Sequence, residues 1–315
     1  MPRVSIITAL HNKGPYIAET IHSVIAQTIL DWEMIVVENG STDNGPEIVR
    51  GVKDPRIQLI VSEKLGPGAA RNHGLQQASG EWVLFLDADD LLAPNYLAER
   101  LGLVEGIPAA NILAGFWEEF QDGERQKLKI CRPATFGIPS RAVEEISIAY
   151  PPWILHAALI RRSWLKSLKP WSEDFDRVQS EDAVFWFRVL QDATLAWGEA
   201  SGAIYRLSTP SSRDAVRDIK IRFESVCRVV QSNLDFLRQQ GREPTLVQRS
   251  VLVRVFEQEY LQLLACGLNV IADEALRQAE SYLAGPGWWF SPGMLARKWM
   301  GIRKINQLRH SMRRD

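Results

Sequence analysis

An apolar run that ends in three aspartates constrains this chain more than any other feature. Residues 82–86 are Trp-Val-Leu-Phe-Leu, and Asp87-Ala88-Asp89-Asp90 follows directly. A short run of valine, leucine and aromatic residues without helical periodicity predicts a buried strand. Because side chains alternate along an extended chain, we expect Asp87 and Asp89 to point the same way and Asp90 the other way. Two such carboxylates are hard ligands suited to Mg²⁺ or Mn²⁺, and a solvated acidic turn is the alternative.

Strand-like and helix-like segments alternate before this cluster. We expect strands at residues 4–8, 34–37, 57–61 and 82–86, and helices at residues 16–27, 46–52 and 68–78. Such alternation is typical of an α/β fold, Rossmann-like, with a mostly parallel sheet flanked by helices. Ligands of these sheets bind beyond the carboxyl ends of the strands, where His11, Asn39 and Asp87 are expected.

The later part of the chain has a different pattern. From residue 91 to about residue 206, helices mix with short strands, and from residue 214 apolar residues recur every three or four positions. That recurrence is typical of amphipathic helices. We therefore expect an α/β domain at residues 1–210 and a C-terminal helical extension with a basic tail at residues 211–315.

Three motifs occur in order along the first 90 residues. They are the run 4–13, ending in His-Asn-Lys; the run 33–43, with Glu-Asn-Gly after a strand; and the run 66–90, with Ala-Arg-Asn before the aspartates. Together they resemble the inverting glycosyltransferases of family 2, which have the GT-A fold. The resemblance is close over residues 3–90 and looser to about residue 206. It implies a nucleotide-binding half at residues 1–90 and an acceptor half at residues 91–210.

The resemblance also implies a donor site. The donor would be a nucleotide-diphosphate sugar, with a UDP-sugar favoured, and the nucleotide would contact Thr8, Ala9, His11, Asn12, Glu38, Asn39, Arg71, Asp87 and Ala88. A divalent metal, Mn²⁺ or Mg²⁺, would be held by Asp89 with Asp87. Such an ion stabilises the negative charge that builds on the leaving diphosphate.

The chain departs from the family at the base-binding positions. Many relatives have an aspartate that binds uracil where this chain has Asn39, and an aromatic residue where it has His11. Ala9 stands where a hydroxyl is common. Asparagine can accept a hydrogen bond but also donates one, so these changes weaken the assignment of UDP.

A second acidic pair, Glu181-Asp182, precedes an apolar and aromatic run that predicts a helix. The resemblance implies that Asp182 is the general base, which takes the proton of the acceptor hydroxyl, and that Glu181 supports the acceptor or the metal. Direct displacement would then invert the anomeric centre. The alternative is that both acids complement the dipole of the helix.

Two further residues have open interpretations. Arg71 is expected to contact the diphosphate or an aspartate of the acidic cluster, and a purely structural ion pair is the alternative. Asp90 suits the N-cap of a helix that begins with Leu91-Leu92-Ala93-Pro94 as well as it suits catalysis.

Composition limits the class of partner. The formal net charge is −1, so we predict no nucleic-acid partner. The three cysteines are scattered without metal-type spacing, which is typical of reduced thiols. The apolar run at residues 4–10 is too short for a signal peptide, and prolines interrupt the stretch 146–160, which is too short to span a membrane. We expect a cytoplasmic protein.

The C-terminal segment is strongly basic. Residues 294–315 contain seven arginines and lysines, one acidic residue and interleaved apolar residues. This pattern predicts a helix on the inner face of an anionic membrane, which would suit a lipid-linked or cell-envelope glycan acceptor. The alternative is a helix packed on its own domain with its charges solvated.

Two other functions stay open at this point. A sugar nucleotidyltransferase usually has a glycine-rich phosphate loop after the first strand, which residues 8–13 lack. A catalytically silent module that binds a glycan or a protein would fit the changes at Ala9, His11 and Asn39. The aspartates at positions 87, 89 and 182 favour an enzyme over that module.

Overall fold

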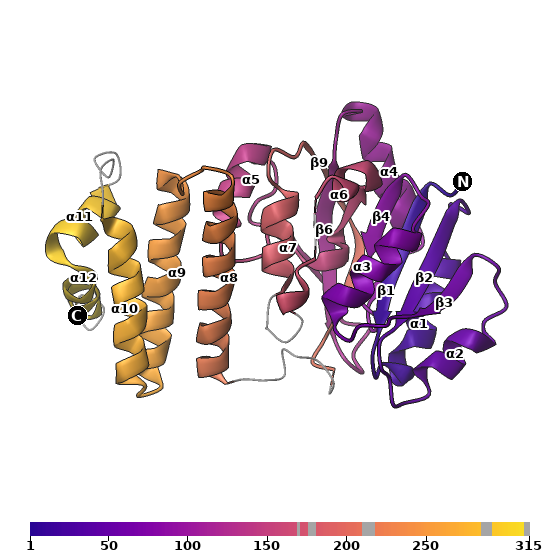
Figure 1. Cartoon of the computed structure of the whole chain (residues 1–315), viewed down its shortest axis with the longest axis horizontal. Helices are drawn as coiled ribbons and strands as arrows, with labels where there is room; N and C mark the ends of the chain where they lie inside the picture. The colour runs from indigo at the N-terminus through magenta and orange to yellow at the C-terminus, as the bar shows by residue number, and fades with distance from the viewer. Residues whose placement is uncertain (169–170, 176–180, 210–217, 285–291, 312–315) are drawn as a thin grey trace. The chain divides into compact units, whose positions relative to one another are not determined.

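The computed structural model describes residues 1–168, 171–175, 181–209, 218–284 and 292–311 (Figure 1). The chain divides into two compact units. One consists of Met1–Glu144 and Pro151–Arg217, and the other of Glu145–Tyr150 and Asp218–Asp315. The short segment 145–150 therefore belongs with the C-terminal helices, although the α/β part of the sequence continues on both sides of it.

In the described residues of the first unit, nine strands form one sheet. They are β1 (Val4–Leu10), β2 (Trp32–Glu38), β3 (Ile57–Val61), β4 (Trp82–Phe85), β5 (Leu91–Leu92), β6 (Ile112–Gln121), β7 (Lys129–Cys131), β8 (Ala158–Arg161) and β9 (Leu195–Leu207). Their order is β3-β2-β1-β4-β8-β6-β9-β5, and β7 pairs with β6.

The two halves of this sheet differ in strand direction. Strands β3, β2, β1 and β4 are parallel neighbours, as expected where each strand is followed by a helix. Beyond β4 the sheet is mixed, because β8 runs antiparallel to β4 and β6 whereas β6 and β9 are parallel. The predicted α/β class is confirmed, with its parallel pairs mainly in the N-terminal half.

Helices of the first unit connect these strands. They are α1 (Gly14–Ile25), α2 (Gly45–Gly51), α3 (Pro67–Gln77), α4 (Tyr96–Gly106), α5 (Ser140–Ile146, which runs into the second unit), α6 (Arg162–Lys166) and α7 (Glu181–Val189). Helix α1 starts two residues before its predicted start, because Pro15 suits the first turn of a helix. It buries Ile17, Ile21 and Val24, which share one face at helical spacing.

Helix α3 lies unusually close to the sheet. It packs on β1 and β2 (Figure 1), and a Cβ atom at Gly74 would lie 2.5 Å from Cγ2 of Ile7 and 3.1 Å from Cγ2 of Val37. Only glycine permits this approach. The close packing brings Arg71, one turn earlier on α3, to the carboxyl edge of the sheet.

The second unit is helical in its described part. Its main helices are α8 (Ile219–Gln239), α9 (Leu246–Ala265), α10 (Asn269–Leu283), α11 (Pro292–Met300) and α12 (Ile302–Ser311). Helices α8 and α9 lie in the region where apolar residues recur every three or four positions, as predicted. The Thr245 hydroxyl caps α9 by accepting from the Gln248 N–H, and the Gln248 side chain accepts from the Thr245 N–H.

The basic tail forms two helices rather than one, because Gly301 between them has φ of +78°. Arg297 is buried and lies 2.8 Å from Glu257, and Arg303 pairs with Asp273. These two ion pairs favour the alternative in which the basic helices pack on their own domain. Residues 312–315 lie outside the described part, and contact of the tail with a membrane stays a prediction. Every helix of the described residues is too short or too polar to cross a bilayer.

Candidate functional site

The predicted acidic cluster is a turn at the carboxyl edge of the sheet. Strand β4 ends at Phe85, one residue before its predicted end, and the Asp90 N–H donates to the Asp87 carbonyl at 3.1 Å. The side chain of Asp87 is 36% exposed, that of Asp89 13% and that of Asp90 1%. Asp90 is thus buried whereas Asp87 and Asp89 are partly exposed, and the three lie in a turn rather than on an extended strand.

Arg71 joins the acidic turn to the second acidic pair. From α3, its guanidinium donates to Asp87 Oδ1 at 2.8 Å and to Glu181 Oε1 at 3.0 Å. The guanidinium also lies over the ring of Trp171, 4.4 Å from its centroid. Burial alone would lower the pKa of Arg71, but the charges of Asp87 and Glu181 outweigh burial and raise the pKa. One buried cation therefore connects residues that the sequence assigned to two separate roles.

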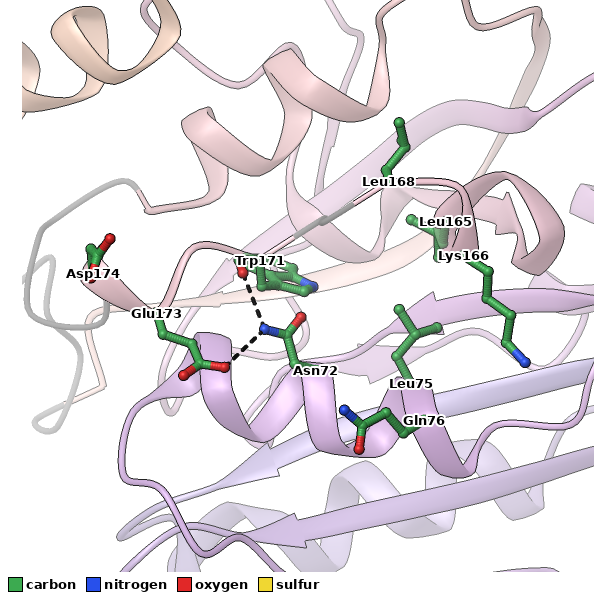
Figure 2. A pocket seen from close by; sticks show the side chains of 9 residues that line it. All are labelled: Asn72, Leu75, Gln76, Leu165, Lys166, Leu168, Trp171, Glu173 and Asp174. Atoms are coloured by element: carbon green, nitrogen blue, oxygen red, sulfur yellow. Dashed lines mark hydrogen bonds between the residues drawn. The ribbon is translucent and has the colours of Figure 1, made fainter. Parts of the chain in front are cut away.

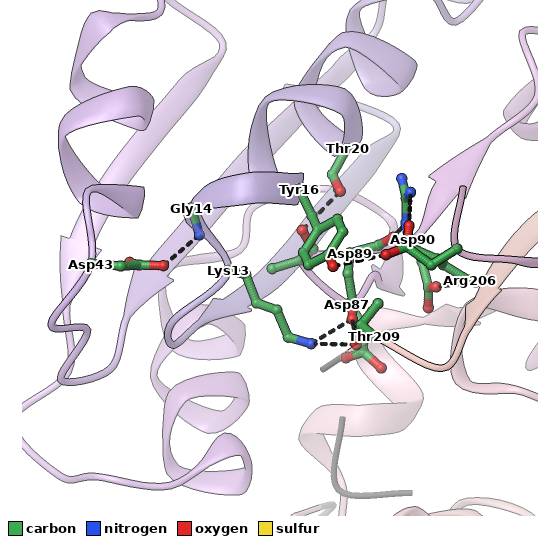
Figure 3. Close-up of polar contacts among 12 residues, drawn as sticks. Lys13, Gly14, Tyr16, Thr20, Asp43, Asp87, Asp89, Asp90, Arg206 and Thr209 are labelled. Carbon is green, nitrogen blue, oxygen red and sulfur yellow. Dashed lines mark hydrogen bonds and ion pairs between the residues drawn. The ribbon is translucent and has the colours of Figure 1, made fainter. Parts of the chain in front are cut away.

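Asp89 is held by two side chains from other parts of the chain (Figure 3). Lys13, in the loop between β1 and α1, places Nζ 2.5 Å from Asp89 Oδ2. The hydroxyl of Thr209 donates to the same oxygen at 3.0 Å and accepts from Lys13 at 3.1 Å. Because β1 and β4 are neighbours, Lys13 spans the space between their carboxyl-end loops, where α/β sheets bind ligands. Asp89 thus already binds a cation, the ammonium of Lys13.

Asp90 has an internal role. Its Oδ1 accepts from the Arg206 N–H at 2.8 Å, and its Oδ2 lies 3.3 Å from Nδ1 of the buried His156. Burial and the charges of Asp89 and Asp87 raise the pKa of Asp90, and burial lowers the pKa of His156 to about 4. The N-cap interpretation of Asp90 is wrong, because α4 starts at Tyr96.

Arg206 fixes the acidic turn from the end of β9. Its Nε donates to the Asp89 carbonyl at 2.8 Å, and its two terminal nitrogens bind Asp122 at 2.9 Å and Glu19 at 2.8 Å. The sequence interpretation missed Arg206, Lys13 and Thr209. The available signals were the arginine near the end of the apolar run 203–207 and a lysine three residues after the first strand.

The predicted base-binding residues lie at the ends of β1 and β2. Asn39 is 5% exposed, and its side-chain amide donates to the Lys64 carbonyl at 2.9 Å and accepts from the Gly66 N–H at 2.7 Å. Thr8 is buried in β1, and Ala9 is half-buried beside it. Ala88 is buried in the acidic turn, where its carbonyl accepts from the Thr20 hydroxyl at 3.0 Å.

Asp87 and Asp89 fit a divalent cation as part of its ligand shell. The described residues contain no group of three or more His, Cys, Asp or Glu side chains arranged to hold a metal. Mg²⁺ usually takes one or two protein carboxylates and completes its shell with phosphate oxygens and water. The pairing of Asp89 with an ammonium shows that this oxygen faces a position where a cation can sit.

A separate cavity of about 430 Å³ lies between α3 and two segments, residues 165–168 and 171–174 (Figure 2). Its walls are Asn72, Leu75, Gln76, Leu165, Lys166, Leu168, Trp171, Glu173 and Asp174. The Asn72 side chain donates to the Trp171 carbonyl at 3.1 Å, which ties the two walls together. No aspartate of the acidic turn lines this cavity, so it is separate from the acidic turn.

Comparison with known proteins decides the family. The model of the family described as "Glycosyl transferase family 2" matches residues 5–169, just over half of the chain. The chain belongs to glycosyl transferase family 2. Among curated relatives, the succinoglycan biosynthesis protein ExoO of Rhizobium meliloti is 38% identical over 102 residues, which cover 32% of this chain and 29% of that protein. The chain covers half or less of the length of the first curated relatives that it matches.

Two solved structures resemble this family 2 chain in fold. S. aureus TarS (residues 1–349), in complex with UDP-GlcNAc, is 18% identical, with a TM-score of 0.69 over 100% of this chain and 92% of that one. The mannosyltransferase PcManGT of Pyrobaculum calidifontis, in complex with GDP-Man and Mn²⁺, is 19% identical, with a TM-score of 0.57 over 97% of this chain and 83% of that one. These likenesses confirm the predicted GT-A fold. Family membership removes the support for a nucleotidyltransferase.

Proposed function

We propose that the chain transfers a sugar from a nucleotide-diphosphate donor to a hydroxyl acceptor, with inversion of the anomeric centre. The observation that carries this proposal is the Arg71 bridge between Asp87 and Glu181. It brings the start of α7, with the acidic pair expected to serve the acceptor, next to the turn expected to serve the donor. Binding and proton transfer would then occur side by side.

The donor diphosphate would lie between the loops after β1 and β4. Asp89 and Asp87 would hold Mn²⁺ or Mg²⁺, which when bound neutralises the charge that builds on the leaving diphosphate. Arg71 holds Asp87 in one orientation, and Arg206 holds the main chain of Asp89. The support from a relative is that PcManGT was solved with Mn²⁺. A UDP-sugar is the favoured donor, since TarS was solved with UDP-GlcNAc.

Asp182 is the better candidate for the general base. Glu181 is 6% exposed and paired with Arg71, so an acceptor hydroxyl would have little access to it. Asp182 is half-buried in the first turn of α7. In the proposed step the acceptor oxygen attacks the anomeric carbon, the bond to the diphosphate breaks with its electron pair on the phosphate oxygen, and Asp182 takes the hydroxyl proton. Glu181, held by Arg71, would support the acceptor or the metal shell.

The acceptor is proposed to be a cell-envelope or extracellular glycan precursor, free or lipid-linked. Support comes from the name of ExoO, which assigns it to succinoglycan biosynthesis. A cytoplasmic location with peripheral contact at the inner membrane face is part of the same proposal. Because Arg297 and Arg303 are engaged in ion pairs, that contact would depend on the other basic residues of the tail.

A panel of nucleotide sugars, with and without Mn²⁺, tests this function. The midpoint of thermal unfolding, Tm, should rise by roughly 5 °C for at least one nucleotide sugar at about a hundredfold excess over its Kd. This rise should occur only when Mn²⁺ is present. The same sugar should release its nucleoside diphosphate when acceptor glycans are added. Stabilisation without release in the presence of envelope glycans would instead identify a silent binding module.

A further inference from the structure

The base end of the proposed donor site has few side-chain atoms available to read a base. Asn39, at the end of β2, has both atoms of its amide engaged by main-chain groups of Lys64 and Gly66. An asparagine has one more N–H and one more lone pair, but this side chain is almost wholly buried. It therefore anchors the loop before α3 rather than presenting a hydrogen-bonding edge to a ligand.

Neighbouring side chains also make hydrogen bonds within the protein. Glu38 accepts from the Ser41 N–H at 2.5 Å, and Asn12 accepts from the N–H and the hydroxyl of Thr42 at 2.8 and 3.1 Å. Thr8 is fully buried, and Ala9 has no polar side-chain atom. One carboxylate oxygen of Glu38 and the amide oxygen of Asn12 thus hold the loop after β2, and the Thr8 hydroxyl lies out of reach of a ligand.

His11 is the exception, because its ring is exposed yet fixed. Its Nδ1 lies 2.9 Å from the Asn39 carbonyl, which sets the orientation of the imidazole. A flat ring in a fixed orientation can stack on a base, and every base offers a π-face, so stacking tolerates base identity. A hydrogen-bonding site behaves otherwise, and can reject an analogue that lacks the matching group by about 10⁴-fold.

We propose that the donor site binds its base by stacking on His11 and reads the base edge only weakly. This rests on the proposed nucleotide-sugar transfer and widens its donor class beyond the UDP-sugars favoured above, because uridine, cytidine, guanosine and adenosine diphosphates would bind alike. Affinity would come mainly from the diphosphate at the acidic turn.

Calorimetric titration of UDP, CDP, GDP and ADP with Mn²⁺ tests this proposal. On the wild-type protein the four Kd values should agree within about tenfold. His11→Ala should weaken all four by about tenfold, whereas His22→Ala, at another exposed histidine, should change none. Asn39→Asp should lower Tm, because a carboxylate oxygen would face the Lys64 carbonyl, and should leave the order of the four nucleotides unchanged.

Two results would overturn the proposal, and they differ. A preference of about a hundredfold or more for one base, altered by Asn39→Asp, would mean that Asn39 reads the base; the transfer function would survive. If none of the four diphosphates binds at any Mn²⁺ concentration, the proposed transfer function is refuted. The proposal that the site reads the base weakly is then refuted as well.

Discussion

The two ends of the proposed donor site are held in different ways. At the end of β4, side chains bind side chains: Asp87 pairs with Arg71, and Asp89 pairs with Lys13. At the end of β2, side chains bind the main chain, as Asn39 does with the loop before α3. A ligand can take over a charge pair by offering another charge, whereas replacing a main-chain hydrogen bond disrupts the loop itself.

This difference separates the part of the site that can exchange partners from the part that is fixed. The Lys13–Asp89 pair is partly exposed, so an incoming cation and phosphate can compete for each partner. Arg71 is buried between two carboxylates, and removing either would break one of its two charge-assisted hydrogen bonds. We expect Asp89 to bind the metal and Asp182 to take the proton, while Arg71 stays paired with Asp87 and Glu181 throughout the reaction.

The largest expected effect is on Asp182, at the reactive end. Asp182→Asn should lower transfer to the acceptor by about a hundredfold or more, because an amide cannot take the hydroxyl proton. Binding of nucleoside diphosphate with Mn²⁺, measured calorimetrically, should stay almost unchanged. Asp174→Asn is the matched control, since Asp174 is an exposed carboxylate upstream of the same helix. Retained transfer in Asp182→Asn would mean that the acidic pair only starts a helix.

A smaller effect should reveal whether the Lys13–Asp89 pair is exchangeable. Lys13→Met removes the ammonium that competes for Asp89 Oδ2 and nearly preserves side-chain length. Binding of Mn²⁺ alone, followed by electron paramagnetic resonance of the free ion, should tighten by about tenfold. Lys64→Met removes an exposed charge paired with Glu173 and serves as the control. Weaker Mn²⁺ binding in Lys13→Met would show that Lys13 supports the cation site instead of filling it.

The smallest effect concerns the buried side of the acidic turn. Burial raises the pKa of Asp90 above its unfolded value, so its contribution to stability is lost as pH rises through the folded pKa. Asp90→Asn has no such titration, and its amide can still accept from the Arg206 N–H. The free energy of unfolding in urea should therefore fall more for the wild type than for the variant as the pH rises from 5 to 9. A difference between variant and wild type that stays constant over this range would mean that Asp90 is already ionised in the fold at pH 5.

Local features of the sequence predicted the parallel half of the sheet. Each strand and helix there is a short apolar pattern bounded by turn residues, and the carboxyl-edge position of Asp87 and Asn39 follows from topology alone. The pattern after residue 90 does not reveal strand order, because β5 pairs with β9, more than 100 residues later. That pairing draws Leu91 into a strand, which is why the N-cap interpretation of Asp90 failed.

The candidate site was predictable in part for the same reason. The acidic turn and Arg71 carry family-like spacing, so their residues could be named in advance. The partners that hold them, Lys13, Thr209 and Arg206, are chosen by long-range packing and have no local pattern. Nor could the sequence reveal that the amide of Asn39 is used by the loop at residues 64–66.

The most direct test of the central claim is a calorimetric titration of UDP in the presence of Mn²⁺. Wild-type protein, Asp89→Asn and Asp90→Asn are compared, since the last two make the same change at adjacent positions with different exposure. We predict that Asp89→Asn loses the Mn²⁺-dependent part of the UDP affinity and that Asp90→Asn keeps it. Equal Mn²⁺-dependent affinity in the wild type and Asp89→Asn would contradict a metal–diphosphate site at the acidic turn.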